Sequence, residues 1–395
     1  ITNSTRRRKR WVHLNSEQAK TKFFGNIYRI IYQDKHTSRQ NIAKKSGISL
    51  PTIASNLNRL TDAGLIHTVG SFQSTGGRKP NIISYVPDAR FALGIDITKN
   101  HLSEVLIDLD LNIIGSKRMY LPFEDSEAYF QILSFEMQQL LNQYLIDPSK
   151  LLGVGLSMPV HVMRDQKTIS YATVVNVSAN IYERLTPYIP YPFLIFNDAN
   201  SAGLAESWIS GSEQPMIYLS LSNSVGGANM NGKEIYKGVN CRATEFGHMC
   251  IVPHGRKCYC GQHGCLDAYC SAKQLSDFTN GNLAEFFHCL KENSNVGLQR
   301  IFDDYLNHLA LAVNNLRMCY DCDIVLGGNV GSYMAEALWF PVSAAAFRRQ
   351  LFREKAVRLN PFEKNGDFIR ICHYRTEASA VGAAAYYVNE FIQNL

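Results

Sequence analysis

The sequence predicts a two-lobed α/β body that carries a small winged helix-turn-helix module at its amino-terminal end. Apolar segments with strand spacing alternate with helical segments over most of the 395 residues, which is typical of α/β proteins. A helical region and two short strands precede them, and this first part is strongly basic. One ordinary hydrophobic core does not accommodate a chain of this length, so two or three domains are expected.

The composition argues against an integral membrane protein and against a disulfide-rich secreted protein. Hydrophobic residues make up 46% of the chain and charged residues 19%, as in a soluble globular protein. No run of about 18 apolar residues occurs, so membrane insertion is not expected. The basic run Arg6–Arg10 lacks a following apolar signal segment, and we expect a cytoplasmic protein. The 10 cysteines are sparse for a disulfide framework and partly clustered, which favours reduced thiols and one metal site.

The net charge of +6 hides an uneven distribution. Residues 1–83 contain 15 Lys and Arg but only 3 Asp and Glu, which gives +12, so the remaining residues carry −6. A basic module attached to an acidic body indicates a phosphate-rich partner, chiefly nucleic acid.

The residues from Lys20 to Leu65 predict three helices, the last two joined through a turn at Gly47. The third begins at Ser49, with Pro51 in its first turn. This is the helix-turn-helix pattern, in which short polar side chains reach base edges in the major groove and arginine reaches phosphate or guanine. The predicted DNA-facing residues of the third helix are Thr52, Ser55, Asn56 and Arg59. An ordinary helical hairpin with a solvated polar face is the alternative.

Two strands around a basic glycine loop predict a wing. Strands are expected at 65–69 and 82–86, with the loop 74–80 between them. The glycines of this loop allow close approach to a duplex, and Arg78 and Lys79 can enter the minor groove or contact phosphate. A solvated turn is the alternative.

In the body, polar residues follow buried strands at the positions where α/β proteins bind ligands. Asn197 and Asp198 end the strand that begins at Phe193, and a helix follows them. Capping of that helix is the alternative role for this pair.

A cysteine cluster stands out in the second half of the chain. Cys258-x-Cys260-x4-Cys265 follows His248, and Glu245 and Asp267 flank the set. Three thiols and an imidazole can hold one tetrahedral metal ion, beside carboxylates that could bind a polar ligand. A metal-free thiol cluster is the alternative, as is a set in which His254 or His263 replaces His248.

These segments resemble one family. Glu245-Phe-Gly-His248 is similar to E-x-G-H, and the segment from Cys258 to Asp267 to C-x-C-G-x-x-G-C-x-E, both signatures of the ROK family (repressors, open reading frames, kinases). The resemblance runs from the wing to Glu377-Ala-Ser-Ala-Val-Gly382, and is greatest to the winged-helix, sugar-responsive repressors. It implies an α/β actin-like ATPase (ribonuclease H-like) body of two lobes. The expected domains are 1–86 for the winged helix with its basic arm, 91–198 with helix 379–395 for lobe 1, and 199–378 for lobe 2, which includes a zinc loop at 245–267.

The resemblance also implies the site residues. A structural zinc ion would be held by His248, Cys258, Cys260 and Cys265. Four protein ligands leave no position for a reactive water, so the ion would brace the loop rather than do chemistry. The implied sugar-binding residues are Asn197, Asp198, Glu245, His248 and Asp267. The chain departs from the family at Asp267, where glutamate is usual, which leaves the sugar open.

The resemblance covers both kinases and repressors, and the glycine loops favour a repressor. In a kinase Asp198 would be the general base. The phosphate loops, however, carry side chains at Thr98-Lys99-Asn100 and Ser222-Asn223-Ser224, where close backbone approach to phosphate requires glycine. We therefore expect no catalytic residues. An ATP-dependent sugar kinase that retains a DNA-binding module is the alternative.

The predicted function is sugar-responsive transcriptional regulation, by repression. The expected partners are double-stranded operator DNA and a monosaccharide effector. Winged-helix proteins read pseudopalindromic sites as symmetric oligomers, so a homodimer or homotetramer is expected. Control by a sugar-transport protein is a further possibility.

Overall fold

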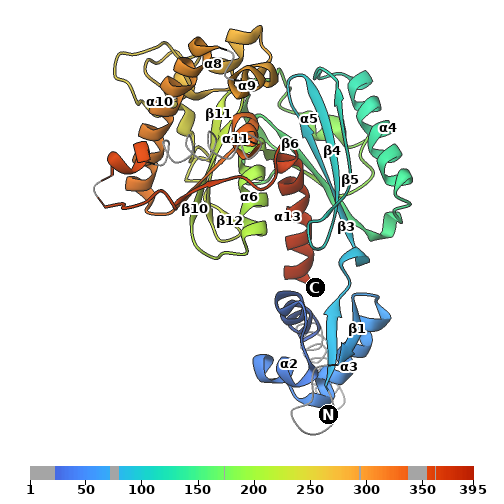
Figure 1. Ribbon diagram of the computed structural model, residues 1–395. Helices are drawn as coiled ribbons and strands as arrows, with labels where there is room; N and C mark the ends of the chain where they lie inside the picture. The colour runs from blue at the N-terminus through green and yellow to red at the C-terminus, as the bar shows by residue number, and fades with distance from the viewer. Residues whose placement is uncertain (1–22, 72–79, 173, 293–294, 337–353, 361) are drawn as a thin grey trace, which may run out of the picture.

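The computed structural model describes residues 23–71, 80–172, 174–292, 295–336, 354–360 and 362–395. A small amino-terminal domain lies below a larger body, and the carboxyl-terminal helix points from the body toward it (Figure 1). Among these residues no helix has the length and apolar character needed to cross a membrane.

The small domain is a winged helix. Residues 23–34 are helical and are followed by α2 (Arg39–Ser46), α3 (Leu50–Asp62) and the antiparallel strands β1 (Ile66–Ser71) and β2 (Asn81–Tyr85). The Ser38 hydroxyl accepts a hydrogen bond from the Asn41 amide at the start of α2, and Gly47 ends that helix with a φ of 68°. Ser49 occupies the N-cap position of α3, but its hydroxyl contacts the Thr52 hydroxyl at 2.9 Å rather than a backbone amide.

The first lobe is built on a five-stranded sheet in the order β5-β4-β3-β6-β9. Strands β3, β4 and β5 are antiparallel, whereas β3, β6 and β9 run parallel. Helix α4 (Glu127–Gln143) packs its buried side on this sheet within one hydrophobic core. The strand bounds are β3 Phe91–Ile97, β4 His101–Asp108, β5 Ile113–Tyr120, β6 Leu151–Met158 and β9 Phe193–Asn197. A hairpin of β7 (Val160–Val162) and β8 (Ile169–Ala172), the short helix α5 (Ile181–Leu185), and the 3-10 turns η1 (Pro87–Ala89) and η2 (Pro148–Lys150) complete this part.

The second lobe repeats the arrangement with the order β12-β11-β10-β13-β14. The bounds are β10 Met216–Leu221, β11 Val225–Asn231, β12 Glu234–Ile235, β13 Asp323–Gly327 and β14 Ile369–Ile371. The helices of this lobe are α7 Asp267–Cys270, α8 Lys273–Ser276, α9 Leu283–Lys291, α10 Val296–Tyr320 and α11 Gly328–Glu336, with 3-10 turns η3 Phe246–His248 and η4 Asp277–Thr279.

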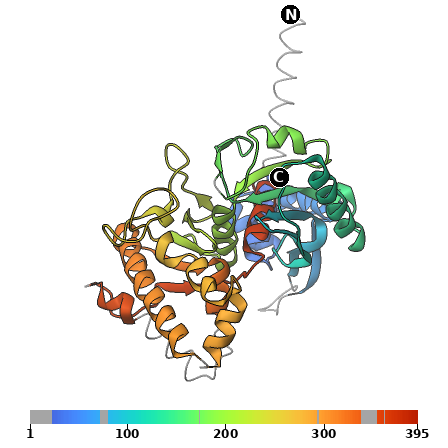
Figure 2. The same ribbon diagram turned by 90° about the horizontal axis from the view of Figure 1, so that it is seen from above.

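Two helices fill the space between the lobes, as the view from above shows (Figure 2). Helix α6 (Asp198–Ser210) packs on the second sheet, α13 (Ala378–Asn394) packs on the first, and the two helices pack closely on each other. Glycine permits this approach, because a Cβ atom at Gly382 would lie 1.6 Å from the Ser201 carbonyl oxygen.

The winged helix shares a hydrophobic core with the body. Tyr28 in the first helix packs edge-on against Phe391 of α13, with ring centroids 6.1 Å apart. Arg29 donates to the Gln393 carbonyl at 2.9 Å, and the Tyr32 hydroxyl donates to the Leu109 carbonyl at 2.7 Å. The Tyr85 hydroxyl adds a hydrogen bond to the Asp110 carboxylate. One cluster of buried apolar residues therefore runs from this domain through α13 and α6 into the second sheet.

Candidate functional site

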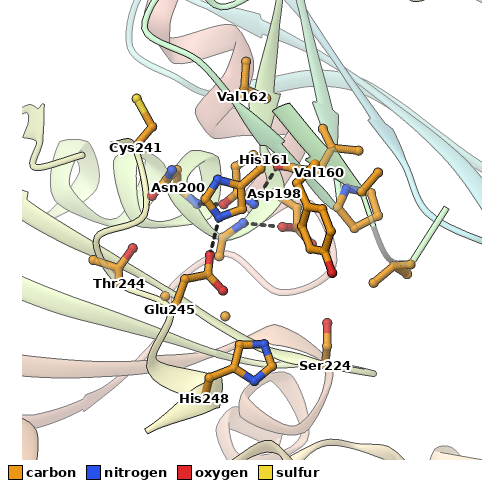
Figure 3. A pocket seen from close by; sticks show the side chains of 18 of the residues that line it. Val160, His161, Val162, Asp198, Asn200, Ser224, Cys241, Thr244, Glu245 and His248 are labelled. Carbon is orange, nitrogen blue, oxygen red and sulfur yellow. Dashed lines mark hydrogen bonds and ion pairs between the residues drawn. The ribbon is translucent and has the colours of Figure 1, made fainter. Parts of the chain in front are cut away.

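A polar pocket lies between the lobes, at the carboxyl ends of β6 and β9 and the start of α6. Lobe 1 contributes His161 and Tyr171 from the β7–β8 hairpin, and lobe 2 contributes Glu245, His248 and Tyr259 from the cysteine-containing loop. Asn197 lines the pocket at the end of β9, and Asp198 and Asn200 line it at the start of α6. Asp198 and Asn200 are labelled in Figure 3. The polar residues that follow the buried strand β9 therefore line a pocket.

Asn197 and Asp198 have different roles in this geometry. Asn197 is the N-cap of α6, since its Oδ1 accepts from the Asn200 amide at 3.0 Å, and its Nδ2 donates to the Val160 carbonyl at 3.2 Å. The capping alternative is therefore observed, although Asn197 also lines the pocket. Asp198 begins the helix, and burial, together with the nearby Glu245 charge, raises its pKa to about 6.

The three cysteines and His248 come together as expected. Their donor atoms all lie within 4.8 Å of one another. The Cys260 and Cys265 sulfurs are 3.7 Å apart, and Cys258 Sγ lies 3.7 Å from His248 Nδ1. Tetrahedral zinc with bonds of about 2.3 Å to sulfur requires sulfur atoms about 3.8 Å apart, so the donor set fits such an ion. His254 and His263, the alternative ligands, are not part of this group.

The outer nitrogen of His248 faces Tyr259, which sequence reasoning missed. The Tyr259 hydroxyl lies 3.3 Å from His248 Nε2, while Nδ1 faces the thiols. A hydrogen-bonding partner on the second nitrogen orients a metal-binding imidazole. The position of Tyr259 between two of the cysteines was the available signal.

Asp267 lies away from the pocket surface. Its side chain is buried, and Oδ2 accepts a hydrogen bond from the Val225 amide at 2.6 Å. Burial raises its pKa, which the hydrogen bond from Val225 partly offsets. Asp267 is not among the residues that line the pocket, whereas Asn197, Asp198, Glu245 and His248 are. The structure thus shows Asp267 holding the start of β11.

His161 is a pocket residue that no sequence motif predicted. Its Nε2 lies 2.7 Å from Glu245 Oε1, which joins the two lobes across the pocket. The dashed line between these side chains is visible in Figure 3. A single histidine between two valines belongs to no motif, and only the fold brings it opposite Glu245.

A second cleft lies on the far side of Asp198, where the degenerate glycine loops meet. Asp96 there accepts a hydrogen bond from Ser157 at 2.9 Å, and burial, with the Asp198 charge, raises its pKa to about 7. The Ser222 hydroxyl accepts from the Asn329 amide at 3.3 Å, and a Cβ at Gly328 would lie 2.6 Å from Ser222 Oγ. A side chain therefore occupies space between the two loops.

Not all of the predicted DNA-facing residues of α3, the third helix of the winged domain, are exposed. Thr52 is half-buried and Ser55 and Arg59 are exposed, but Asn56 is buried, so its assignment to the DNA-facing side was wrong. Asn56 follows Ile53 by three positions and thus shares the buried stripe of α3, where its amide donates to the Thr52 carbonyl. Asn58, two positions further along α3, is exposed. Arg78, Lys79 and the basic arm lie outside the described residues.

The Arg59 guanidinium is partly engaged within the domain. It lies over the Phe24 ring at 4.8 Å from the centroid and donates to Asn56 Oδ1 at 3.3 Å. These contacts hold the guanidinium at the edge of the exposed face of α3.

Comparison with known proteins identifies the family. The ROK family model matches residues 92–390, which is most of the chain. The chain belongs to the ROK family. A model described as winged helix-turn-helix DNA-binding matches residues 25–67, ahead of the ROK body. The predicted family is therefore confirmed.

Curated relatives of this ROK protein are named as repressors or transcriptional regulators. It is 28% identical to the xylose repressor of Bacillus subtilis (strain 168) over 251 residues, which cover 62% of this chain and 64% of that repressor. It is 24% identical to a putative xylose repressor of Caldicellulosiruptor sp. (strain Rt8B.4) over 82% of this chain and 86% of the relative. The DNA-binding transcriptional dual regulator NagC of Escherichia coli K12 is 26% identical over 61% of this chain and 60% of NagC. The match thus spans less than two thirds of the Bacillus and Escherichia relatives.

Solved structures confirm the predicted fold class. A ROK family transcriptional regulator described as a homologue of the E. coli MLC protein superposes with a TM-score of 0.72 at 16% identity, over 95% of this chain and 98% of that one. A ROK hexokinase from Thermus thermophilus gives a TM-score of 0.61 at 22% identity, over 77% of this chain and 99% of the hexokinase. The regulator therefore superposes on nearly the whole chain, and the hexokinase on about three quarters of it.

Proposed function

We propose that this ROK protein is a sugar-responsive transcriptional repressor, in which a monosaccharide bound between the lobes controls the binding of operator DNA. One observation carries the proposal: the winged helix is packed on α13, and the other end of α13 contacts the pocket. The Ser379 hydroxyl at the start of α13 donates to the Asp198 carbonyl at 3.2 Å, while Phe391 at its far end packs on Tyr28. The names of the curated relatives support the same function.

The pocket chemistry supports a neutral sugar as the effector. Asp198 and Glu245 offer carboxylate oxygens from opposite sides, and His248 and Asn197 add polar atoms. Carboxylates accept hydrogen bonds from vicinal hydroxyl groups and repel an anionic ligand. We assign Asp198, Glu245 and His248 to direct sugar contact, in which His248 Nε2 would exchange the Tyr259 hydroxyl for a sugar hydroxyl. Asn197 we assign to both capping and contact, and Asp267 to support of β11 behind them.

The four-residue cluster supports a structural zinc ion held by His248, Cys258, Cys260 and Cys265. With all four positions filled by protein, such an ion would stabilise the loop and supply no reactive water. Glu245 directly precedes the 3-10 turn that contains His248. Bracing of this loop would therefore fix the position of Glu245 in the pocket.

The α13 connection suggests how lobe closure reaches the DNA. Closure around a sugar would change the position of α6, and α13 packs on α6 through positions such as Gly382 that leave no room for independent movement. The turn from Asp108 to Asn112 forms a second contact with the winged helix, through Leu109 and Asp110. In a homodimer or homotetramer on a pseudopalindromic operator, a small rotation at these contacts would alter the spacing of the two winged helices.

An ATP-dependent sugar kinase is the second candidate, since Asp198 has the position and raised pKa of a general base. The side chains of Ser222 and its neighbours in the phosphate loops oppose it. A coupled assay with ATP and the panel of D-xylose, D-glucose, D-mannose, D-fructose and N-acetylglucosamine separates the two. Turnover above about 1 s⁻¹ with any of these sugars would contradict a purely regulatory role.

The direct test is ligand-linked stability together with DNA binding. Thermal unfolding of the full chain is measured with each sugar of the panel, and binding to a duplex selected from a random-sequence library is measured with and without the stabilising sugar. At 100 times its Kd a ligand adds about 2.7 kcal/mol of stability. Asp198→Asn should lose the sugar response and retain DNA binding. The proposal fails if no sugar stabilises the protein, or if a stabilising sugar leaves DNA affinity unchanged. Response to a sugar-transport protein would be a separate mode of control.

A further inference from the structure

The cross-lobe contact between His161 and Glu245 lies inside the pocket and not at a distant hinge. His161 comes from the β7–β8 hairpin of lobe 1, and Glu245 from the loop of lobe 2 that carries His248. Figure 3 shows the two side chains meeting between Asp198 on one side and His248 on the other. The contact therefore occupies the space in which a ligand held by those residues would lie.

The backbone of β7 fixes the direction of His161. Val160 and Val162 pack in the buried core of lobe 1, and His161 between them reaches across the pocket to Glu245 of lobe 2. The Asn197 amide donates to the Val160 carbonyl, which ties the strand to the N-terminus of α6. With 18% of its side chain exposed, His161 is held in place at the pocket wall.

Glu245 is held less firmly by its surroundings. Its side chain is 49% exposed, and His161 is its partner in the described part of the chain. Its backbone is fixed by the 3-10 turn that leads to His248. A carboxylate of this kind can exchange one hydrogen-bonding partner for another at little cost, because neither partner is deeply buried.

A third polar group at the same place has no partner within the described residues. Asn200 lines the pocket, and its side-chain oxygen is buried without a hydrogen bond. A buried acceptor that lacks a donor costs free energy. His161 and Glu245 thus offer an imidazole nitrogen and a carboxylate to one ligand, while the unsatisfied Asn200 oxygen is buried near the start of α6.

We propose that His161 is an effector-binding residue, which with Glu245 holds two adjacent hydroxyl groups of a neutral polyol from opposite lobes. This rests on the sugar-binding function proposed above and deepens it. A hydroxyl both donates and accepts, so one can donate to the Glu245 carboxylate while its neighbour bonds the imidazole. The direct bond between the two side chains is then replaced by bonds through the ligand, and closure of the lobes depends on hydroxyl groups at particular positions. His161 is in this way a residue that discriminates among sugars.

The test compares His161→Ala and His161→Gln with the wild-type full chain. Binding of D-xylose, D-glucose, D-mannose, D-fructose and N-acetylglucosamine is measured by calorimetry, together with the monodeoxy analogues of whichever sugar binds. His288→Ala is the matched control, because His288 forms a similar imidazole–carboxylate pair with Glu292 on the surface of α9. Melting temperature and bound zinc show whether the variants fold.

We expect His161→Ala to weaken sugar binding by ten-fold or more, with His161→Gln intermediate and the control unchanged. We also expect His161→Ala to bind one deoxy analogue and the parent sugar with equal affinity, whereas the wild type binds the parent sugar more tightly. A role limited to positioning Glu245 would not remove discrimination at a single hydroxyl. The proposal is wrong if His161→Ala binds the sugar as tightly as the wild type and still distinguishes it from every deoxy analogue. That result would leave the proposed sugar binding itself intact. If the wild type binds no sugar of the panel, the proposed function itself is contradicted, and this inference falls with it.

Discussion

Glu104 carries a carboxyl group that the fold buries without any hydrogen-bonding partner among the described residues. It lies in β4, is 0% exposed, and both of its side-chain oxygens are unsatisfied. The groups facing it are Lys117, opposite it on β5, Glu136 on α4 and the buried Tyr129 hydroxyl. Lys117 is already paired with Glu136. We predict that Glu104 is protonated in the folded protein at neutral pH.

Burial, reinforced by the Glu136 charge, raises the pKa of Glu104 from 4.5 to about 8. A carboxyl group whose folded pKa is raised contributes stability that is fully present below its unfolded pKa and is lost as pH rises through the folded pKa. Each pKa unit corresponds to 1.36 kcal/mol. Between pH 5 and pH 8, ionisation of Glu104 in the unfolded chain should therefore reduce the free energy of unfolding by about 3 kcal/mol.

The perturbation is Glu104→Gln, which replaces the titrating group by a neutral one of the same size. Free energies of unfolding in urea are measured at intervals from pH 5 to pH 8 for the variant and the wild type. Other buried acids, such as Asp96 and Asp198, titrate in both proteins, so the difference between them isolates Glu104. As pH rises from 5 to 8, the free energy of unfolding of the variant should increase by about 3 kcal/mol relative to that of the wild type. Glu127→Gln, at an exposed position of α4, is the control. A difference that stays constant with pH would refute the reasoning, because it would mean that Glu104 is solvated or paired.

Three further predictions concern the proposed zinc-binding residues, helix α3 of the winged domain, and the packing of α13 on α6. Cys265→Ser should reduce bound zinc from about one equivalent per chain and lower the melting temperature, both measured on protein purified without chelator. Asn56→Ala should cost about 1 kcal/mol of stability, because its buried amide bonds the Thr52 carbonyl, whereas Asn58→Ala should weaken binding to a selected duplex and leave stability unchanged. Gly382→Ala should destabilise by about 3 kcal/mol in urea unfolding, because the new Cβ would meet the Ser201 carbonyl.

The sequence predicted the fold class because its signals are local. Each signal is contained within a few residues: hydrophobic periodicity, glycine turns, and the signatures at 245–248 and 258–267. Together these signals predict the α/β body and the cysteine-containing loop within it. The donor atoms of His248, Cys258, Cys260 and Cys265 meet as expected because three of these four residues lie within eight positions, from Cys258 to Cys265. Asn56 shows the limit of such reasoning: residue polarity suggested an exposed side chain, but its spacing from Ile53, Leu57 and Leu60 placed it in the buried stripe.

The features that escaped prediction arise between elements distant in sequence. His161 and Glu245 are 84 positions apart, and Arg29 lies 364 positions from the carbonyl of Gln393. Glu245 has a local signature, but nothing near it in the sequence indicates His161 as its partner, and no local signal pairs Arg29 with Gln393. Both pairs nevertheless lie on the route that regulation would take: the first joins the lobes within the pocket, and the second joins α13 to the winged helix. If sugar binding rearranges the first contact, the rigid packing of α13 on α6 transmits the change to the second without a flexible linker. Weakening the second contact, by Arg29→Ala, should then uncouple DNA binding from sugar while leaving sugar affinity intact.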